Sequence, residues 1–222
     1  MDFIFMLTRS DQTVPNGLEV LDYIRPLGLK HIGFKDIGVD RDTMHKLNRE
    51  IPNAGATSYI ELVSLDQDAC RESALAAKEI GIDRLMGGTD VNGILDALQG
   101  SNVSYLPFPG RPVGHPVQWA ATADEVEVDC RRFMEMGCGG CDALAYRAID
   151  ADPMDLVRAA RIGLGDGYLV NAGSVSRREQ IAELRAAGCD AFTIGSAAFD
   201  GSFSPLKGSL RSQLKDILEA CG

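Results

Sequence analysis

The sequence predicts a single (β/α)8 barrel, an α/β fold, spanning residues 1–222. Three observations predict it. The chain has 222 residues, 45% of them hydrophobic, which suffices for the core of one such barrel. Apolar segments of strand length alternate with segments of helical spacing along the whole chain. Glycine turns at Gly28, Gly55, Gly81, Gly137 and Gly188 lead into the next apolar segment.

Eight segments are expected as parallel strands because they are short and continuously apolar, as strands covered on both faces are. They are residues 3–7, 31–34, 57–62, 84–86, 104–107, 143–146, 168–171 and 191–194. Helices are expected at residues 17–27, 40–50, 67–80, 91–98, 123–136, 153–162, 176–187 and 209–220. An open doubly wound sheet is the rival, but it favours a GxGxxG turn after the first strand. The first turn here reads LTRSDQTVPNG, which does not fit.

Composition limits the partners. The formal net charge of −10 disfavours an extended nucleic-acid surface and contact with anionic lipid. The first residues, MDFIFMLTR, lack the basic start of a signal peptide, and no apolar run reaches the roughly 20 residues of a membrane span. We therefore expect a cytoplasmic protein with no nucleic-acid or membrane partner. The sequence leaves open whether the chain forms a homodimer.

The cysteines and histidines do not predict a metal site. Cys138-Gly-Gly-Cys141 has neither a second CxxC nor a histidine pair beside it. We interpret it as a tight turn with small buried thiols, in preference to a redox pair or half a zinc site.

Two turns near the end of the chain predict an anion site. The seventh strand leads into Ala172-Gly173-Ser174, and the eighth into Gly195-Ser196. Glycine lets backbone amides approach an anion, and barrels of this kind hold phosphate at these two loops. The alternative is that Gly173 and Gly195 only make tight turns.

Residues 167–199, GYLVNAGSVSRREQIAELRAAGCDAFTIGSAAF, resemble the phosphate-binding half of the ribulose-phosphate-binding barrel superfamily. That group includes sugar-phosphate epimerases, N-acylmannosamine-6-phosphate epimerases, and orotidine- and ketogulonate-phosphate decarboxylases. The resemblance covers about the last third of the chain and implies the barrel fold and a phosphate handle. It does not select a reaction.

The strand ends supply candidate catalytic groups. Lys35 closes the second strand, where it could serve as acid, base or Schiff-base nucleophile, while the adjacent Asp36 would keep it charged. Glu61 interrupts an apolar strand and could be a general base. A Lys35–Glu61 pair that merely fills the barrel mouth is the alternative. No cofactor is required by this chemistry, although Mg²⁺ on Glu61 and Asp36 stays open.

Three further strand-end residues could orient a substrate. The guanidinium of Arg147 is suited to binding a phosphate or a carboxylate of the substrate. Asp90 and Asp150 could act similarly, but each could equally cap the next helix.

A long loop after the fifth strand, residues 107–119, contains Arg111, His115 and the only tryptophan. Long loops on barrels often act as lids, so we expect this one to close over a ligand. Arg9, at the end of the first strand, could join it.

These features predict an enzyme acting on a small phosphorylated sugar or sugar acid through an enediolate. An isomerase or epimerase is favoured because proton transfer needs only two positioned groups. An aldolase or decarboxylase-type lyase is the first alternative. A phosphometabolite sensor, similar in outline to the glycerol-3-phosphate-responsive antiterminators, is the second.

Overall fold

A computed structural model describes residues 1–114 and 116–222. Its centre is an eight-stranded parallel sheet in the order β10-β11-β12-β1-β4-β5-β6-β7. The strands are β1 Asp2–Met6, β4 His31–Lys35, β5 Thr57–Glu61, β6 Arg84–Met86, β7 Ser104–Leu106, β10 Gly140–Ala143, β11 Tyr168–Asn171 and β12 Ala191–Ile194.

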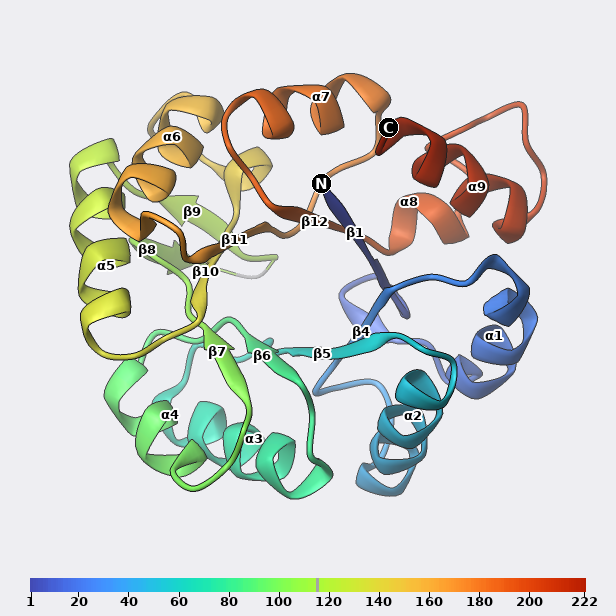
Figure 1. Cartoon of the computed structure of the whole chain (residues 1–222), viewed down its shortest axis with the longest axis horizontal. Coiled ribbons are helices and arrows are strands. Elements are labelled where there is room, and N and C mark those ends of the chain that lie inside the picture. The colour runs from blue at the N-terminus through green and yellow to red at the C-terminus, as the bar shows by residue number, and fades with distance from the viewer. Residues whose placement is uncertain (115) are drawn as a thin grey trace.

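The two ends of this sheet meet. The amide of Gly139 donates to the carbonyl of Tyr105, and that of Asp142 donates to the carbonyl of Pro107, both at 2.9 Å. Figure 1 shows the strands around the centre and the helices outside them. The predicted (β/α)8 barrel is therefore confirmed.

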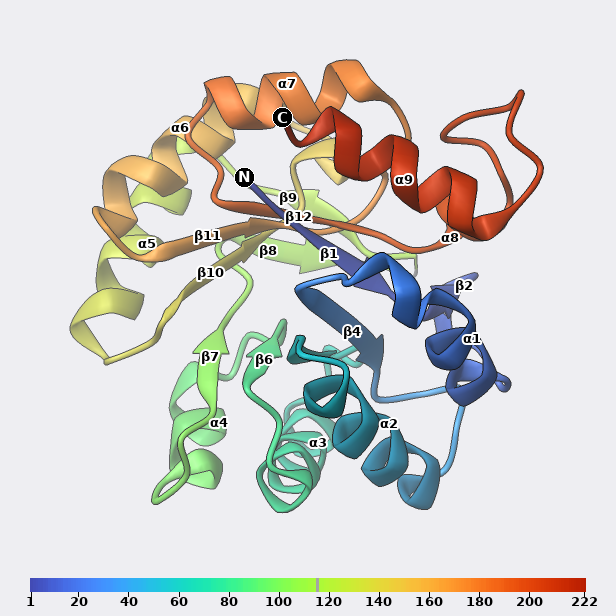
Figure 2. The ribbon, with the colours of Figure 1, turned by 45° about the vertical axis from the view of Figure 1, so that its right-hand side comes forward.

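The helices form the outer ring, which the view in Figure 2 shows from another side. They are α1 Gly17–Ile24, α2 Arg41–Asn53, α3 Gln67–Ile80, α4 Val91–Leu98, α5 Ala123–Glu135, α6 Pro153–Leu164, α7 Arg178–Ala186, α8 Ser196–Phe199 and α9 Leu210–Ala220, with 3₁₀ turns η1 Arg25–Leu27 and η2 Ala145–Arg147. Aspartate side chains cap several of them, and Thr122 and Glu125 form a capping box on α5. In the described residues, no helix combines the length and apolar character needed to cross a membrane.

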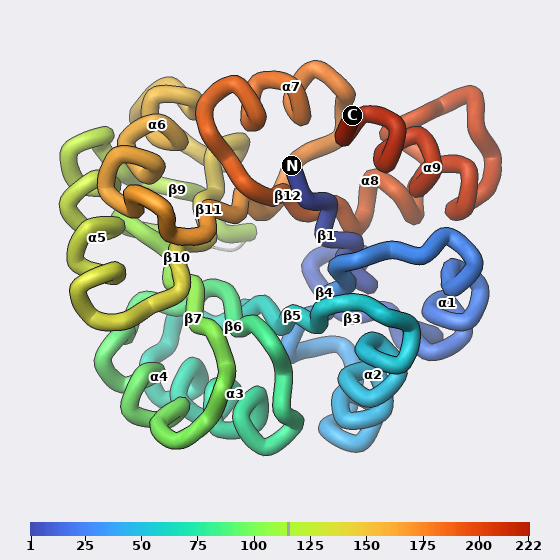
Figure 3. Tube along the Cα trace, in the orientation of Figure 1, coloured from blue at the N-terminus to red at the C-terminus, as the bar shows by residue number. Residues whose placement is uncertain are grey.

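The last helix closes the ring beside the first. Helix α9 packs against α7 and α8, and Arg211 on α9 donates to the carbonyl of Tyr23 at the end of α1, at 2.6 Å. Figure 3 follows the chain from this closure back to β1.

Two antiparallel hairpins interrupt the regular repeat. Strands β2 Thr8–Arg9 and β3 Gln12–Thr13 form one directly after β1, and β8 Arg111–Val113 and β9 Gln118–Ala120 form the other after β7. Both occupy connections that follow barrel strands, at the end of the barrel where ligands bind.

Alternation along the strands separates two cores. The side chains of Ile4, Met6, Tyr59, Met86, Leu106, Val170 and Ala191 form an interior cluster, and the larger core packs between strands and helices. Because successive strand residues face opposite sides, register with this cluster identifies the other inward positions.

Candidate functional site

The strand register places charged side chains inside the barrel, at the C-terminal ends of β4 and β5. Lys35 is paired with Glu61, and Glu61 with Met86 of the interior cluster. Lys35 and Glu61 are each only 6% exposed. The two residues that the sequence singled out are thus neighbours on adjacent strands.

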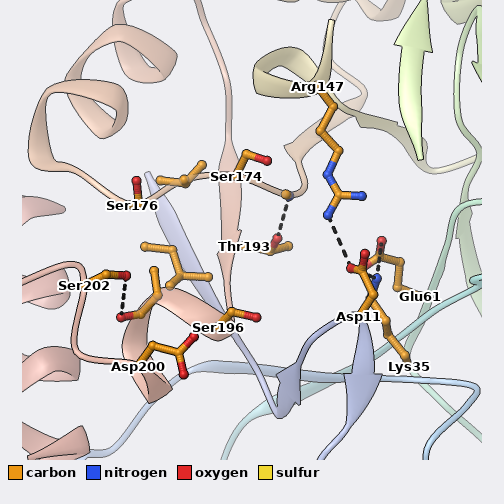
Figure 4. A pocket seen from close by; sticks show the side chains of 15 residues that line it. Asp11, Lys35, Glu61, Arg147, Ser174, Ser176, Thr193, Ser196, Asp200 and Ser202 are labelled. Atoms are coloured by element: carbon orange, nitrogen blue, oxygen red, sulfur yellow. Dashed lines mark hydrogen bonds and ion pairs between the residues drawn. The ribbon is translucent and has the colours of Figure 1, made fainter. Parts of the chain in front are cut away.

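Four side chains form the ionic cluster, which consists of Asp11, Lys35, Glu61 and Arg147. Lys35 Nζ lies 2.9 Å from Asp11 Oδ1 and 3.4 Å from Glu61 Oε1. Arg147 Nη2 lies 3.3 Å from the same Asp11 Oδ1. Figure 4 shows these groups converging from β4, β5, η2 and the β2–β3 hairpin.

The cluster determines the charge of its members. Burial by itself lowers the pKa of Lys35, but the carboxylates of Glu61 and Asp11 outweigh it, so the pKa is raised above its ordinary value. Burial raises the pKa of Asp11, but Lys35 and Arg147 outweigh it, so the pKa is lowered. At neutral pH Lys35 is therefore an ammonium and Asp11 a carboxylate.

Sequence reasoning missed Asp11. It lies at the tip of the β2–β3 hairpin, where Ser10 and Asp11 have φ values of 51° and 60°. The hairpin folds back over β4, since Thr13 Oγ1 and the backbone of Lys35 are hydrogen-bonded at 2.8 Å. Aspartate tolerates this left-handed conformation better than most residues. The presence of an aspartate after the first strand was therefore the one local sign of a tight turn.

The predicted phosphate loops line the same cavity as the ionic cluster. This cavity has a volume of about 400 Å³. Besides the four cluster residues it is lined by Gly173, Ser174, Val175, Ser176, Thr193, Ile194, Gly195, Ser196, Ala197, Asp200 and Ser202. Ala172 lies just beneath, fully buried, with its amide donating to the carbonyl of Ala143.

The loops present donors to this cavity. The amides of Ser174 and Val175 have no hydrogen-bond acceptor among the described residues. Those of Ser196 and Ala197 begin α8, where the first amides lack intrahelical acceptors. One carboxylate, Asp200, also lines the cavity, and Arg9 pairs with it at 2.6 Å.

The two loop glycines cannot be replaced without displacing neighbours. A Cβ on Gly173, whose φ is +78°, would lie 2.3 Å from Arg147 Nε. A Cβ on Gly195 would lie 2.4 Å from Thr8 Oγ1 and 2.7 Å from the carbonyl oxygen of Thr8. The close approach at Gly173 also places the Arg147 guanidinium directly over the loop that follows β11.

We expect Gly173→Ala to push Arg147 from its position and to weaken binding of phosphorylated ligands by about tenfold or more, the value of one charged hydrogen bond. Gly137→Ala is the matched control, because Gly137 has a φ of +86° but nothing within 4 Å of an added Cβ. Both variants should lose about 1 kcal/mol of stability through backbone strain. Calorimetric titration should show weaker binding for Gly173→Ala alone; equal binding by both variants would contradict a role for this loop.

Asp36 does not belong to the site. Its Oδ1 accepts from the amide of Val63 at 3.0 Å and its Oδ2 from the hydroxyl of Ser73 at 2.7 Å, beside a small cavity lined by α2 and α3. Because Lys35 points inward, its neighbour Asp36 points outward. Glu61 and Asp36, the pair left open for Mg²⁺, are therefore separated, and the carboxylates that keep Lys35 charged are Glu61 and Asp11 instead of Asp36. No group of three or more metal-ligating side chains is found within the described residues.

Asp90 and Asp150 lie outside the cavity. Asp90 caps α4 by accepting from the amide of Gly93 at 3.2 Å, and it pairs with Arg71 at 2.6 Å. Asp150 is exposed before α6, which Asp152 caps. The helix-capping alternative thus describes Asp90 on α4, and on α6 it describes Asp152 instead of Asp150.

Two of the residues expected in a lid, Arg9 and Arg111, lie at the rim of the cavity or beyond it. Arg9 contacts the cavity through Asp200, whereas Arg111 pairs with Glu125 of α5. His115 lies outside the described residues. Trp119 is fully buried, and its indole donates to the carbonyl of Pro109 at 2.6 Å, so the base of this loop is anchored.

A second missed residue lies deeper in the barrel. Asp142 on β10 is paired in register with Val170 of the interior cluster, so its side chain points inward. It is fully buried, and neither carboxyl oxygen has a hydrogen-bond partner in the described part of the chain. Burial, followed by the charge of Glu61, raises the pKa of Asp142 well above its ordinary value against the pull of Lys35 and Arg147. Burial without a hydrogen-bond partner therefore favours the neutral form of this carboxyl group.

This buried carboxyl group makes stability depend on pH. In the unfolded chain Asp142 loses its proton near pH ~4, but in the folded chain only at higher pH. Above the pKa of the unfolded group, Asp142 therefore lowers the free energy of unfolding of the wild-type protein by about 1.4 kcal/mol for each pH unit. Asp142→Asn, which has no proton to lose, should become progressively more stable than wild type as the pH rises from about 4, the pKa of the unfolded group, towards the raised pKa of the folded group. Urea denaturation across this range measures the difference, and a pH-independent difference would show that Asp142 is ionised in the fold.

Cys138 and Cys141 are buried free thiols, which agrees with the structural interpretation of that turn. Burial raises the pKa of Cys138 to about 11 and that of Cys141 well above its ordinary value. Neither is an activated thiolate at neutral pH.

Solved structures share this architecture. Orotidine 5′-phosphate decarboxylase from Pyrococcus horikoshii superposes with a TM-score of 0.69 at 13% identity, covering 99% of this chain and 98% of that one. A tryptophan synthase α-subunit from Pyrococcus furiosus gives 0.68 at 14% identity, covering 98% of each chain. Thiamine phosphate pyrophosphorylase from Pyrococcus furiosus gives 0.61 at 12% identity, covering 100% of this chain and 97% of that one.

These similarities confirm the fold that the resemblance of residues 167–199 implied. No family model matches the sequence, and no curated protein matches it. At identities of 12–14% the shared feature is the barrel itself, so the reaction must be argued from the site.

Proposed function

We propose that this chain is an enzyme that moves a proton on a small phosphorylated sugar or sugar acid through an enediolate, as an isomerase or epimerase does. One observation carries the proposal. The two phosphate loops and the buried pair Lys35–Glu61 line a single cavity of about 400 Å³, the size of a small-molecule site.

The loops suit the phosphate end of the ligand. They offer the amides of Ser174 and Val175, which have no acceptor among the described residues. Backbone amides in such loops are usual partners of a phosphate, whereas the guanidinium of Arg147 faces Asp11. Two of the structural neighbours, orotidine 5′-phosphate decarboxylase and thiamine phosphate pyrophosphorylase, carry phosphorylated compounds in their names, which agrees with this assignment.

The Lys35–Glu61 pair suits the reacting end. A carboxylate such as Glu61 can remove a proton from the carbon beside a carbonyl, and an ammonium 3.4 Å away can stabilise the oxyanion that forms. Because the raised pKa keeps Lys35 protonated, it is a poor nucleophile. This disfavours a Schiff-base lyase and favours an enolate mechanism.

Two measurements test the proposal. Phosphorylated sugars and sugar acids should raise the melting temperature, whereas their unphosphorylated counterparts should not. The best stabiliser, incubated with the protein in D₂O, should then incorporate deuterium at a carbon beside its carbonyl. If no phosphorylated compound stabilises the protein, the phosphate site is wrong. Binding without exchange or turnover would favour the sensor.

A further inference from the structure

One oxygen atom bridges the two cations of the cavity. Asp11 Oδ1 lies 2.9 Å from Lys35 Nζ and 3.3 Å from Arg147 Nη2. Lys35 has a second carboxylate partner in Glu61, but Arg147 has no other carboxylate partner among the described residues. Without the Asp11 side chain, the guanidinium of Arg147, which is only 17% exposed, would lack a counter-ion.

Asp11 contacts the two cations of the cavity and does not form part of the barrel wall. Within the described part of the chain, its side-chain hydrogen bonds and ion pairs are those with Lys35 and Arg147. It belongs to no barrel strand, and Figure 4 shows it reaching into the cavity from the hairpin. The carboxylate thus fills an anion position inside the cavity while the barrel is built by other residues.

The hairpin that carries Asp11 is linked to the phosphate loop. Its two turn residues, Ser10 and Asp11, both have positive φ values, which is the pattern of the favoured two-residue hairpin turns. The amide of Ser10 donates to Ser196 Oγ at 3.2 Å, and the neighbouring Arg9 pairs with Asp200. A ligand bound at Ser196 would therefore contact the same loop that holds the hairpin tip in place.

We propose that Asp11 occupies the position of a ligand carboxylate, and that the ligand is a small acid carrying both a phosphate and a carboxylate. The ligand carboxylate displaces Asp11, bridges Lys35 and Arg147, and restores the charge balance. Arg147 suits this role because a guanidinium binds a carboxylate with two parallel hydrogen bonds. The proposal rests on the phosphate site described under Proposed function, and it selects sugar acids over neutral sugars.

Matched ligand pairs test it by calorimetry. In 3-phosphoglycerate and glycerol phosphate, and in 4-phosphoerythronate and erythritol phosphate, the members of each pair differ only in carrying a carboxylate or a CH₂OH group. Asp11→Asn removes the competing charge, and asparagine tolerates the left-handed backbone as well as aspartate does. Its affinity for the acid of at least one pair should rise by about tenfold or more relative to the alcohol, the value of a charged hydrogen bond. Asp11→Gly, which also accepts this backbone, should shift the ratio in the same direction.

A charge control separates this effect from general attraction of anions. Asp200→Asn removes one negative charge from the same cavity at its phosphate end. It should change the affinities for acid and alcohol by similar factors, leaving their ratio within about twofold.

The outcomes distinguish the two proposals. If the alcohols bind but the acid-to-alcohol ratio in Asp11→Asn and Asp11→Gly stays at the wild-type value or falls, Asp11 does not compete with a carboxylate, and only the present inference is overturned. If neither acid nor alcohol binds to any form of the protein, the phosphate site fails and both proposals are overturned.

Discussion

Lys35→Met should lower kcat/KM by about a thousandfold or more on the substrate identified by deuterium exchange. Methionine has a similar length but no charge, so the variant loses the group that stabilises the developing oxyanion. Removing one preorganised donor from such a site costs about two to three orders of magnitude, and a full charge should cost at least as much. Steady-state kinetics measure the loss, and retention of kcat/KM within about tenfold would remove Lys35 from the chemistry.

The control must separate catalysis from packing, since Lys35 also neutralises buried carboxylates. In Lys35→Met, Glu61 is only 6% exposed and loses its cation, which should destabilise the fold by about 3–5 kcal/mol. The double variant Lys35→Met/Glu61→Gln has no unpaired charge on Glu61, so much of the melting temperature should return. Because Glu61 is itself the proposed base, the double variant reports on stability alone. The activity of Lys35→Met is therefore measured at a temperature at which circular dichroism shows this variant to be folded. If Lys35 only fills the barrel mouth, the folded variant should keep kcat/KM within about tenfold of wild type, and if Lys35 is catalytic, the folded variant should still lose turnover.

The sequence predicted those parts of the site that depend on local sequence patterns. The loops after β11 and β12 combine small residues with a following helical segment, and the structure places Gly173, Ser174, Gly195 and Ser196 along one cavity. Lys35 and Glu61 each end an apolar strand, and in a parallel sheet such ends meet at the same edge. Their pairing follows from strand order alone.

The error at Asp36 could have been avoided by the same reasoning. Consecutive residues on a strand face opposite sides, so Lys35 and Asp36 could not both point into the barrel. The omission of Asp142 has another cause. We expected the sixth strand at residues 143–146, but β10 is Gly140–Ala143, so the shift placed Asp142 outside the strand. The glycines before it made the start of the strand resemble a turn.

Asp11 could not be found from local patterns. Its partners Lys35 and Arg147 are 24 and 136 residues away in the chain. They meet only because a short hairpin with unusual backbone angles folds back over the barrel mouth. Contacts of this kind depend on the closed barrel, which brings the first and sixth strand–helix connections together.

Glu61→Gln should abolish solvent deuterium incorporation and lower kcat by about 10²- to 10⁴-fold, the range for loss of a general base. Glutamine keeps the shape of the side chain but cannot accept the proton. Because the phosphate is held by other loops, ligand affinity should change much less than kcat. The deuterium content of the recovered substrate, measured by NMR, and the separate values of kcat and KM provide the readout.

Asp150→Asn is the matched control for Glu61→Gln, because it is the same carboxylate-to-amide exchange at an exposed position outside the cavity. It should leave both exchange and kcat near wild type, whereas an equal loss in both variants would point to overall charge instead of a base at Glu61. If Glu61→Gln retains exchange, the proton must be removed by another carboxylate facing the ligand. Asp11 lines the cavity and is ionised at neutral pH, so it is the other carboxylate to test. Loss of exchange in Asp11→Asn would assign Asp11 as the base and would overturn the inference that a ligand carboxylate displaces it.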